Sequence, residues 1–89
     1  MIRKRVTAHG EVQGVGFRFH TQATANRLGV SGVVRNLEDG SVEAEIEAEE
    51  GPVERMVAWI REGPPWSNVR SVDVVDLEPT GDRGFRIDQ

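Results

Sequence analysis

A glycine-rich stretch that ends in an arginine is the part of this sequence best suited to chemistry. It runs Gly10-Glu11-Val12-Gln13-Gly14-Val15-Gly16-Phe17-Arg18 and joins an expected strand to an expected helix. Glycine lets the backbone turn its N–H groups toward one point, and a helix N-terminus carries partial positive charge. An arginine there is unfavourable by itself, but it adds a planar charged donor. The combination predicts a cradle for a phosphate-like anion.

The same stretch has a second interpretation, a tight strand-to-helix turn with a solvated arginine, because glycine-rich turns are common. Asn36 is the other candidate for chemistry. Its amide has both donors and an acceptor, so it can orient a water molecule. Asn36 also precedes a hairpin turn, where asparagine is common for backbone reasons. The residues taken alone leave both alternatives open.

Composition narrows the function classes. The 89 residues predict one domain, over 1–89. The absence of cysteine from the sequence excludes disulfides and thiolate metal ligands, and His9 and His20 lack a metal-ligand spacing, so we expect neither metal nor cofactor. A net charge of −4 argues against broad binding to nucleic acid backbones. No apolar stretch suits a signal peptide or a membrane span, so we expect a cytoplasmic protein with no membrane partner.

Periodicity and turn signals predict two helices and several strands. Gly29 suits the end of the first helix, Asp39-Gly40 suits a hairpin, and Gly63-Pro64-Pro65 suits the end of the second helix. Pro52 suits the first position of that second helix. The expected strands cover about 2–12, 30–36, 42–48, 69–77 and 85–87, and the expected helices about 18–28 and 52–62.

The strand expected over 42–48 has the clearest pattern. Its aliphatic residues alternate with glutamates, so all the carboxylates lie on one face of the sheet. We interpret that face as solvated rather than catalytic, with cross-strand pairs to Arg3 or Arg5 that contribute little if exposed. The order strand, helix, strand, strand, helix, strand, with 85–87 as a short final strand, predicts an α+β fold. This is a split β-α-β arrangement with two helices on one face of an antiparallel sheet.

At this point the sequence resembles the acylphosphatase family over nearly its whole length. The first signature segment is the stretch from Gly10 to Arg18, and the second is Gly32-Val33-Val34-Arg35-Asn36. Further support comes from Leu28-Gly29-Val30, Asp39-Gly40-Ser41-Val42-Glu43 and the closing Phe85-Arg86-Ile87. The joint order and spacing of two segments is far more specific than a single glycine-rich turn. The resemblance implies a ferredoxin-like α/β sandwich, βαββαβ.

The resemblance also implies an activity, the hydrolysis of acyl phosphates to carboxylate and inorganic phosphate without a metal or a covalent intermediate. It implies that Arg18 binds the phosphoryl group and that Asn36 orients the attacking water. It assigns phosphate binding through backbone N–H groups to a loop of five residues: Gln13, Gly14, Val15, Gly16 and Phe17. The expected ligands are small acyl phosphates, with phosphate or sulfate as product-like ligands, and we expect a monomer.

The sequence departs from the family pattern at Val33, where many members carry tryptophan, at Leu37, where a small polar residue is frequent, and at Ser67, often alanine. None of these removes a proposed catalytic group. Two other classes remain as alternatives, a non-catalytic anion-binding module and an RNA-binding domain suggested by Arg3-Lys4-Arg5. RNA binding would need exposed aromatic residues on the sheet, where the clearest strand carries glutamate.

Overall fold

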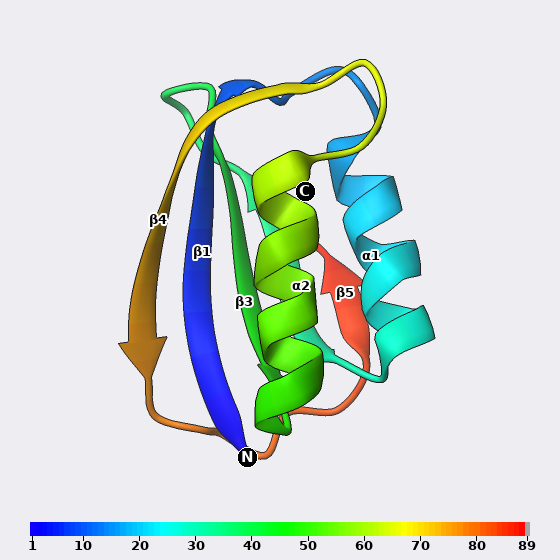
Figure 1. Cartoon of the computed structure of the whole chain (residues 1–89), viewed down its shortest axis with the longest axis vertical. Helices are drawn as coiled ribbons and strands as arrows, with labels where there is room; N and C mark the ends of the chain where they lie inside the picture. Colours follow the sequence, from blue (N-terminus) through cyan, green and yellow to red (C-terminus); the bar gives the residue numbers. More distant parts are fainter. Residues whose placement is uncertain (89) are drawn as a thin grey trace.

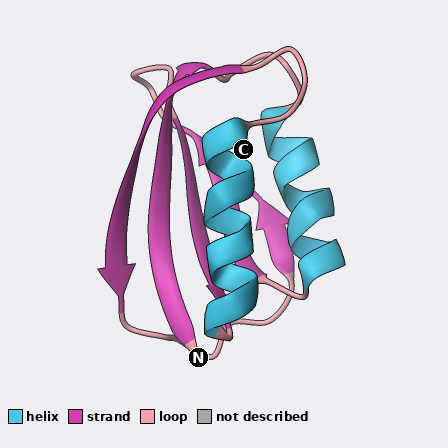
Figure 2. Ribbon diagram, in the orientation of Figure 1, coloured by secondary structure: helices cyan, strands magenta, loops and turns pink. Residues whose placement is uncertain are grey.

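The computed structural model describes residues 1–88 and has two helices packed on one face of a five-stranded sheet (Figures 1 and 2). The elements are β1 (Ile2–Glu11), α1 (Phe17–Leu28), β2 (Ser31–Asn36), β3 (Val42–Ala48), α2 (Glu50–Glu62), β4 (Asn68–Leu77) and β5 (Phe85–Ile87). The expected α+β sandwich is therefore confirmed. No helix among the described residues is long and apolar enough to cross a membrane.

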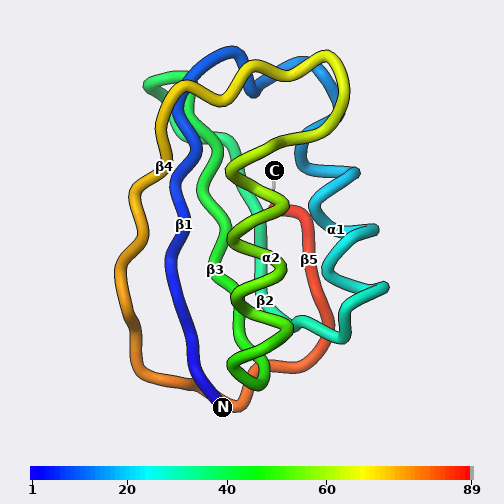
Figure 3. The backbone as a smooth tube through the Cα atoms, viewed as in Figure 1, coloured from blue at the N-terminus to red at the C-terminus, as the bar shows by residue number. Residues whose placement is uncertain are grey.

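The sheet is mixed, with the strand order β4-β1-β3-β2-β5. The four longer strands pair with one another in antiparallel fashion, as the sequence predicted. The short β5 differs, because Phe85 to Ile87 pair in parallel with Gly32 to Val34 of β2. Since β4 and β5 lie at opposite edges, the chain between them crosses the end of the sheet (Figure 3). A three-residue strand carries no sequence signal for its direction.

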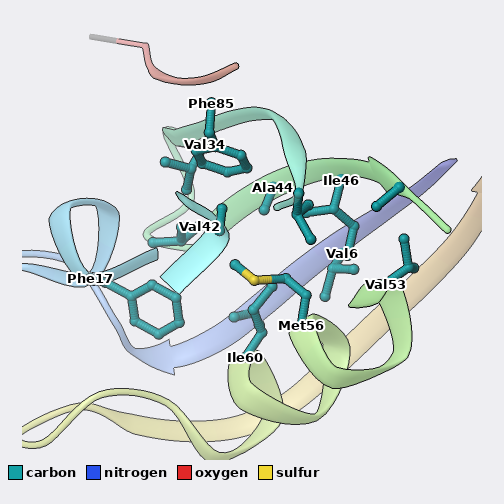
Figure 4. Close-up of a cluster of buried hydrophobic side chains, with 14 of the residues drawn as sticks. Val6, Phe17, Val34, Val42, Ala44, Ile46, Val53, Met56, Ile60 and Phe85 are labelled. Atoms are coloured by element: carbon teal, nitrogen blue, oxygen red, sulfur yellow. The ribbon is translucent and has the colours of Figure 1, made fainter. Parts of the chain in front are cut away.

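The core lies between the sheet and the helices. Alternation along β1 and β3 puts Val6, Ala8 and Ile46 on the helix-facing side, and all three are fully buried. The α2 stripe of Val53, Met56 and Ile60 packs against them, as its helical spacing predicts. In Figure 4 the side chains of β1, β3 and α2 that it labels point toward one another: Val6, Ile46, Val53, Met56 and Ile60. Phe17, the first residue of α1, belongs to the same cluster, so the glycine-rich loop is anchored to the core where it becomes a helix.

The helix ends follow the glycine signals, with one difference. Gly16 and Gly29 flank α1 in left-handed backbone conformations, with φ of 76° and 73°. The second helix begins at Glu50, two residues before the expected start at Pro52. Pro52 still lies in the first turn, where backbone N–H groups have no partner within the helix and a missing one costs little.

The glutamate face of β3 is not wholly solvated, so the interpretation from sequence is wrong for Glu47. Glu47 is only 2% exposed, and Arg3 of β1 is 6% exposed. Nη1 of Arg3 donates to Glu47 Oε1 at 3.0 Å, and the backbone N–H groups of Thr80 and Gly81 each donate to the same carboxylate at 2.8 Å. The crossing segment between β4 and β5 covers this end of the sheet. The alternation of β3 alone could not show that.

These contacts change the acidity of Glu47. The hydrogen bond from the Thr80 N–H lowers the pKa, burial acts in the opposite direction, and Arg3 and the Gly81 N–H lower it further, to about 2. The carboxylate therefore stays ionised far into the acid range. It ties the segment that precedes β5 to the third strand.

Candidate active site

The two signature segments meet at one depression of about 250 Å³. The connections β1–α1 and β2–β3 lie at the same end of the molecule, together with the α2–β4 connection (Figure 1). The lining comes from the β1–α1 loop, the start of α1, the end of β2 and the end of β5. It consists of Val12, Gly14, Gly16, Phe17, Arg18, Phe19, Asn36 and Ile87.

The loop contributes backbone rather than side chains. Gly14 and Gly16 have φ of 78° and 76°, a left-handed conformation that side chains disfavour. A Cβ on Gly14 would meet no atom within 4 Å, so conformation, not space, requires glycine there. The helical bonds begin with the His20 N–H donating to the Gly16 carbonyl at 3.0 Å. The first-turn N–H groups of α1 are therefore available to an anion at the depression.

Arg18 lines the depression and is bonded to a segment far away in the sequence. Its Nη1 donates to the backbone carbonyl of Asp88, just after β5, at 3.2 Å. The half-buried guanidinium thus connects the second residue of α1 with the end of the last strand. This contact holds a planar cationic donor beside the amides of the loop. A tetrahedral oxyanion at that place would accept hydrogen bonds and lie next to a positive charge.

Asn36 is the last residue of β2, and its exposed side chain lines the same depression. The turn that follows fixes its position, because the Leu37 N–H donates to the Ser41 carbonyl at 2.9 Å. The Asp39 carboxylate accepts the Ser41 N–H at 2.9 Å and also the Ser41 hydroxyl, and these bonds lower the pKa of Asp39. Asn36 thus lies directly before a turn that several hydrogen bonds hold in place.

Gln13 and Val15, two residues of the expected phosphate loop, do not line the depression. The Gln13 side-chain amide donates to the carbonyls of Leu37 and Ser41, at 2.8 and 2.9 Å. It ties the glycine-rich loop to the hairpin that carries Asn36. Val15 is half-buried and packs against the core. The structure brings together the other expected groups: Gly14, Gly16, Phe17, Arg18 and Asn36.

Three lining residues were not among the expected site residues: Val12, Phe19 and Ile87. Val12 belongs to the first signature segment and Ile87 to the closing strand. The motifs therefore include both residues but do not predict that their side chains line the depression. Phe19 directly follows Arg18, at a position where helical periodicity predicts exposure, and nothing in the sequence marks it as part of a site.

Neither tryptophan lines the depression. Trp59 of α2 is half-buried and packs edge-on against Phe17, with ring centroids 6.0 Å apart. Trp66, in the α2–β4 connection, is 84% exposed and lies outside the lining of the depression. Within residues 1–88, no group of three or more His, Cys, Asp or Glu side chains could hold a metal ion.

Loop glycines, an arginine and an asparagine thus line one depression of a small α+β sandwich. The comparisons with known proteins make the class specific. Residues 4–87 match the family model described as Acylphosphatase. The chain belongs to the acylphosphatase family.

The relatives cover nearly the whole chain. It is 51% identical over 87 residues to the acylphosphatase of Trichormus variabilis, covering 98% of this chain and 86% of that one. It is 49% identical over 88 residues to the acylphosphatase of Thermococcus kodakarensis, covering 94% and 97% of the two chains. The crystal structure of acylphosphatase from Bacillus subtilis matches with a TM-score of 0.95 and 33% identity over 100% of both chains.

Proposed function

We propose that this protein hydrolyses the carboxyl–phosphate bond of acyl phosphates, releasing a carboxylate and inorganic phosphate without a metal ion. Membership of the acylphosphatase family supports the reaction class. The single observation that carries the assignment of roles is the meeting of Gly14, Gly16, Arg18 and Asn36 at one depression.

The loop and Arg18 bind the phosphoryl group. Backbone N–H groups of the loop at Gly14 and Gly16 and of the first turn of α1 donate to its oxygens. The Arg18 guanidinium neutralises part of the dianion. Because the guanidinium stays charged and presents two parallel donors, it can follow the phosphoryl oxygens as the group flattens in the transition state. The cationic arginine and the aligned amides thus supply the charge stabilisation that a metal ion gives in other phosphoryl-transfer sites.

Asn36 orients the attacking water. The water oxygen forms a bond to phosphorus while the bond from phosphorus to the acyl oxygen breaks, and that electron pair leaves with the carboxylate. Since a carboxylate is a weakly basic leaving group, no strong general acid is required. An amide is a poor base, so the water's proton goes to a phosphoryl oxygen of the substrate. Asn36 contributes position rather than proton transfer.

The test is phosphate release from benzoyl phosphate and acetyl phosphate by the purified protein, with and without EDTA. We expect each substrate to be hydrolysed as fast with EDTA as without it, because the chain's own donors hold the phosphoryl group. Loss of activity in EDTA that a divalent ion restores would refute the metal-free mechanism. Competitive inhibition by inorganic phosphate without any hydrolysis would instead indicate an anion-binding module.

A further inference from the structure

The depression has an apolar side that the phosphoryl chemistry does not use. Phe19 lines it with 65% of its surface exposed, and the half-buried Ile87 lines it from β5. Val12 and Phe17 also contribute to the lining, but they are 1% and 3% exposed and belong to the core. The apolar surface that a ligand can contact is therefore that of Phe19 and Ile87.

These two residues flank the phosphoryl-binding arginine. Phe19 follows Arg18 in α1, and Ile87 precedes Asp88, whose carbonyl accepts the Arg18 hydrogen bond. The Phe19 ring packs edge-on against His20, with ring centroids 5.7 Å apart. An isolated exposed phenylalanine needs no explanation on a protein surface. Phe19, however, lies inside the lining of the depression, beside the cation.

The geometry of in-line displacement says which part of the substrate reaches this surface. The entering water and the leaving oxygen lie on opposite sides of phosphorus. Asn36 reaches the depression from the end of β2, in the sheet, and Phe19 reaches it from α1, in the helix layer (Figure 1). If Asn36 holds the water, the acyl group extends toward the helix layer. The depression, of about 250 Å³, includes both sides, because Asn36 and Phe19 line it together.

We propose that Phe19 forms an acyl-binding surface that makes this protein favour acyl phosphates with an aromatic or bulky apolar acyl group. The inference rests on the proposed function and names the substrate class of the same site. A benzoyl ring laid on Phe19 removes on the order of 50 Å² of apolar surface from water, which corresponds to about a tenfold gain in affinity. The methyl group of acetyl phosphate is too small for a comparable contact.

The experiment compares wild-type protein, Phe19→Ala and the control Trp66→Ala with benzoyl phosphate and acetyl phosphate. Trp66 is a matched control because it is exposed, aromatic and outside the lining. For Phe19→Ala we expect kcat/KM to fall about tenfold with benzoyl phosphate and to stay within about twofold with acetyl phosphate. Inhibition by inorganic phosphate, which has no acyl group, should be unchanged. Trp66→Ala should match the wild type with both substrates.

Three results would overturn the inference while leaving the hydrolysis intact. Equal losses with both substrates, together with weaker phosphate inhibition, would mean that Phe19 shapes the phosphate loop. Unchanged kinetics with benzoyl phosphate would mean that the acyl group does not contact Phe19. A loss in Trp66→Ala equal to that in Phe19→Ala would assign the effect to general surface hydrophobicity. Failure of the wild-type protein on both substrates would instead refute the proposed function, and with it this inference.

Discussion

Replacing Asn36 by alanine should separate catalysis from phosphate binding. Asn36 ends β2, and its backbone pairs with Val42, which the substitution leaves in place. Its side chain is exposed, so the free energy of unfolding should change by no more than about 0.5 kcal/mol. Arg18 and the loop amides remain, so phosphate affinity should be close to that of the wild type. Turnover should fall by roughly 10²–10³-fold, because the attacking water loses a preorganised polar partner.

Asn36→Asp makes the test sharper because it replaces the amide by a carboxylate of the same shape. If water orientation and electrostatics dominate, this variant should also be slow, since it places negative charge beside a phosphoryl dianion. If the missing general base limits the wild-type reaction, the aspartate variant should be active. Its rate should then rise with pH through the pKa of the new carboxyl.

The assay measures kcat with benzoyl phosphate and the dissociation constant of inorganic phosphate for both variants, with folding checked by circular dichroism. Asn68→Ala is the matched control, because Asn68 is an exposed asparagine at a strand end, on β4, outside the depression. A folded Asn36→Ala protein with near-wild-type turnover would refute the role of Asn36. It would leave Arg18 as the only assigned catalytic side chain.

Three further outcomes are expected. Arg18→Lys should lower kcat/KM by roughly 10²-fold although the charge is retained, because lysine lacks the planar pair of donors. The control Arg27→Lys, on the exposed part of α1, should leave kcat/KM unchanged. Near-normal kinetics for Arg18→Lys would mean that Arg18 acts only through its charge. Gly32→Ala should destabilise the fold by about 3 kcal/mol in urea unfolding, because the new Cβ would lie 1.8 Å from a backbone oxygen of β3. The control Gly40→Ala should lose only about 1 kcal/mol, because a Cβ there meets nothing within 4 Å and only the left-handed backbone is strained. Equal losses would show that β2 and β3 move apart without cost. Glu47→Gln should destabilise the protein most at neutral pH. The stability from a carboxyl whose folded pKa is about 2 is fully present above its ordinary value of 4.5 and disappears as pH falls toward 2, so a pH-independent difference in thermal unfolding would contradict this account.

Much of the fold follows from local patterns in the sequence. The alternation along β3 and the stripe on α2 define their buried faces, because periods of two and of 3.6 need no knowledge of the partner. The family resemblance named Arg18 and Asn36 as site residues, and both line the depression.

The parts that sequence reasoning missed depend on contacts between distant segments. Burial of Glu47 comes from the crossing segment near Thr80, 33 residues further along the chain. Polar alternation could not show that one glutamate of the row is covered. The role of the Gln13 side chain depends on carbonyls 24 and 28 residues away. The direction of β5 depends on which edge of the sheet remained open, which is a property of the assembled fold.

The long-range hydrogen bonds around the depression have a consequence for folding kinetics. Gln13 joins the glycine-rich loop to the β2–β3 hairpin, and Arg18 bonds to Asp88, 70 residues away in the chain. Neither contact forms from local structure, and bringing such distant segments together costs chain entropy before any bond rewards it. After dilution from denaturant, helical circular dichroism should therefore recover no later than enzymatic activity. The recovery of activity then reports the formation of the contacts that join Gln13 to the β2–β3 hairpin and Arg18 to Asp88.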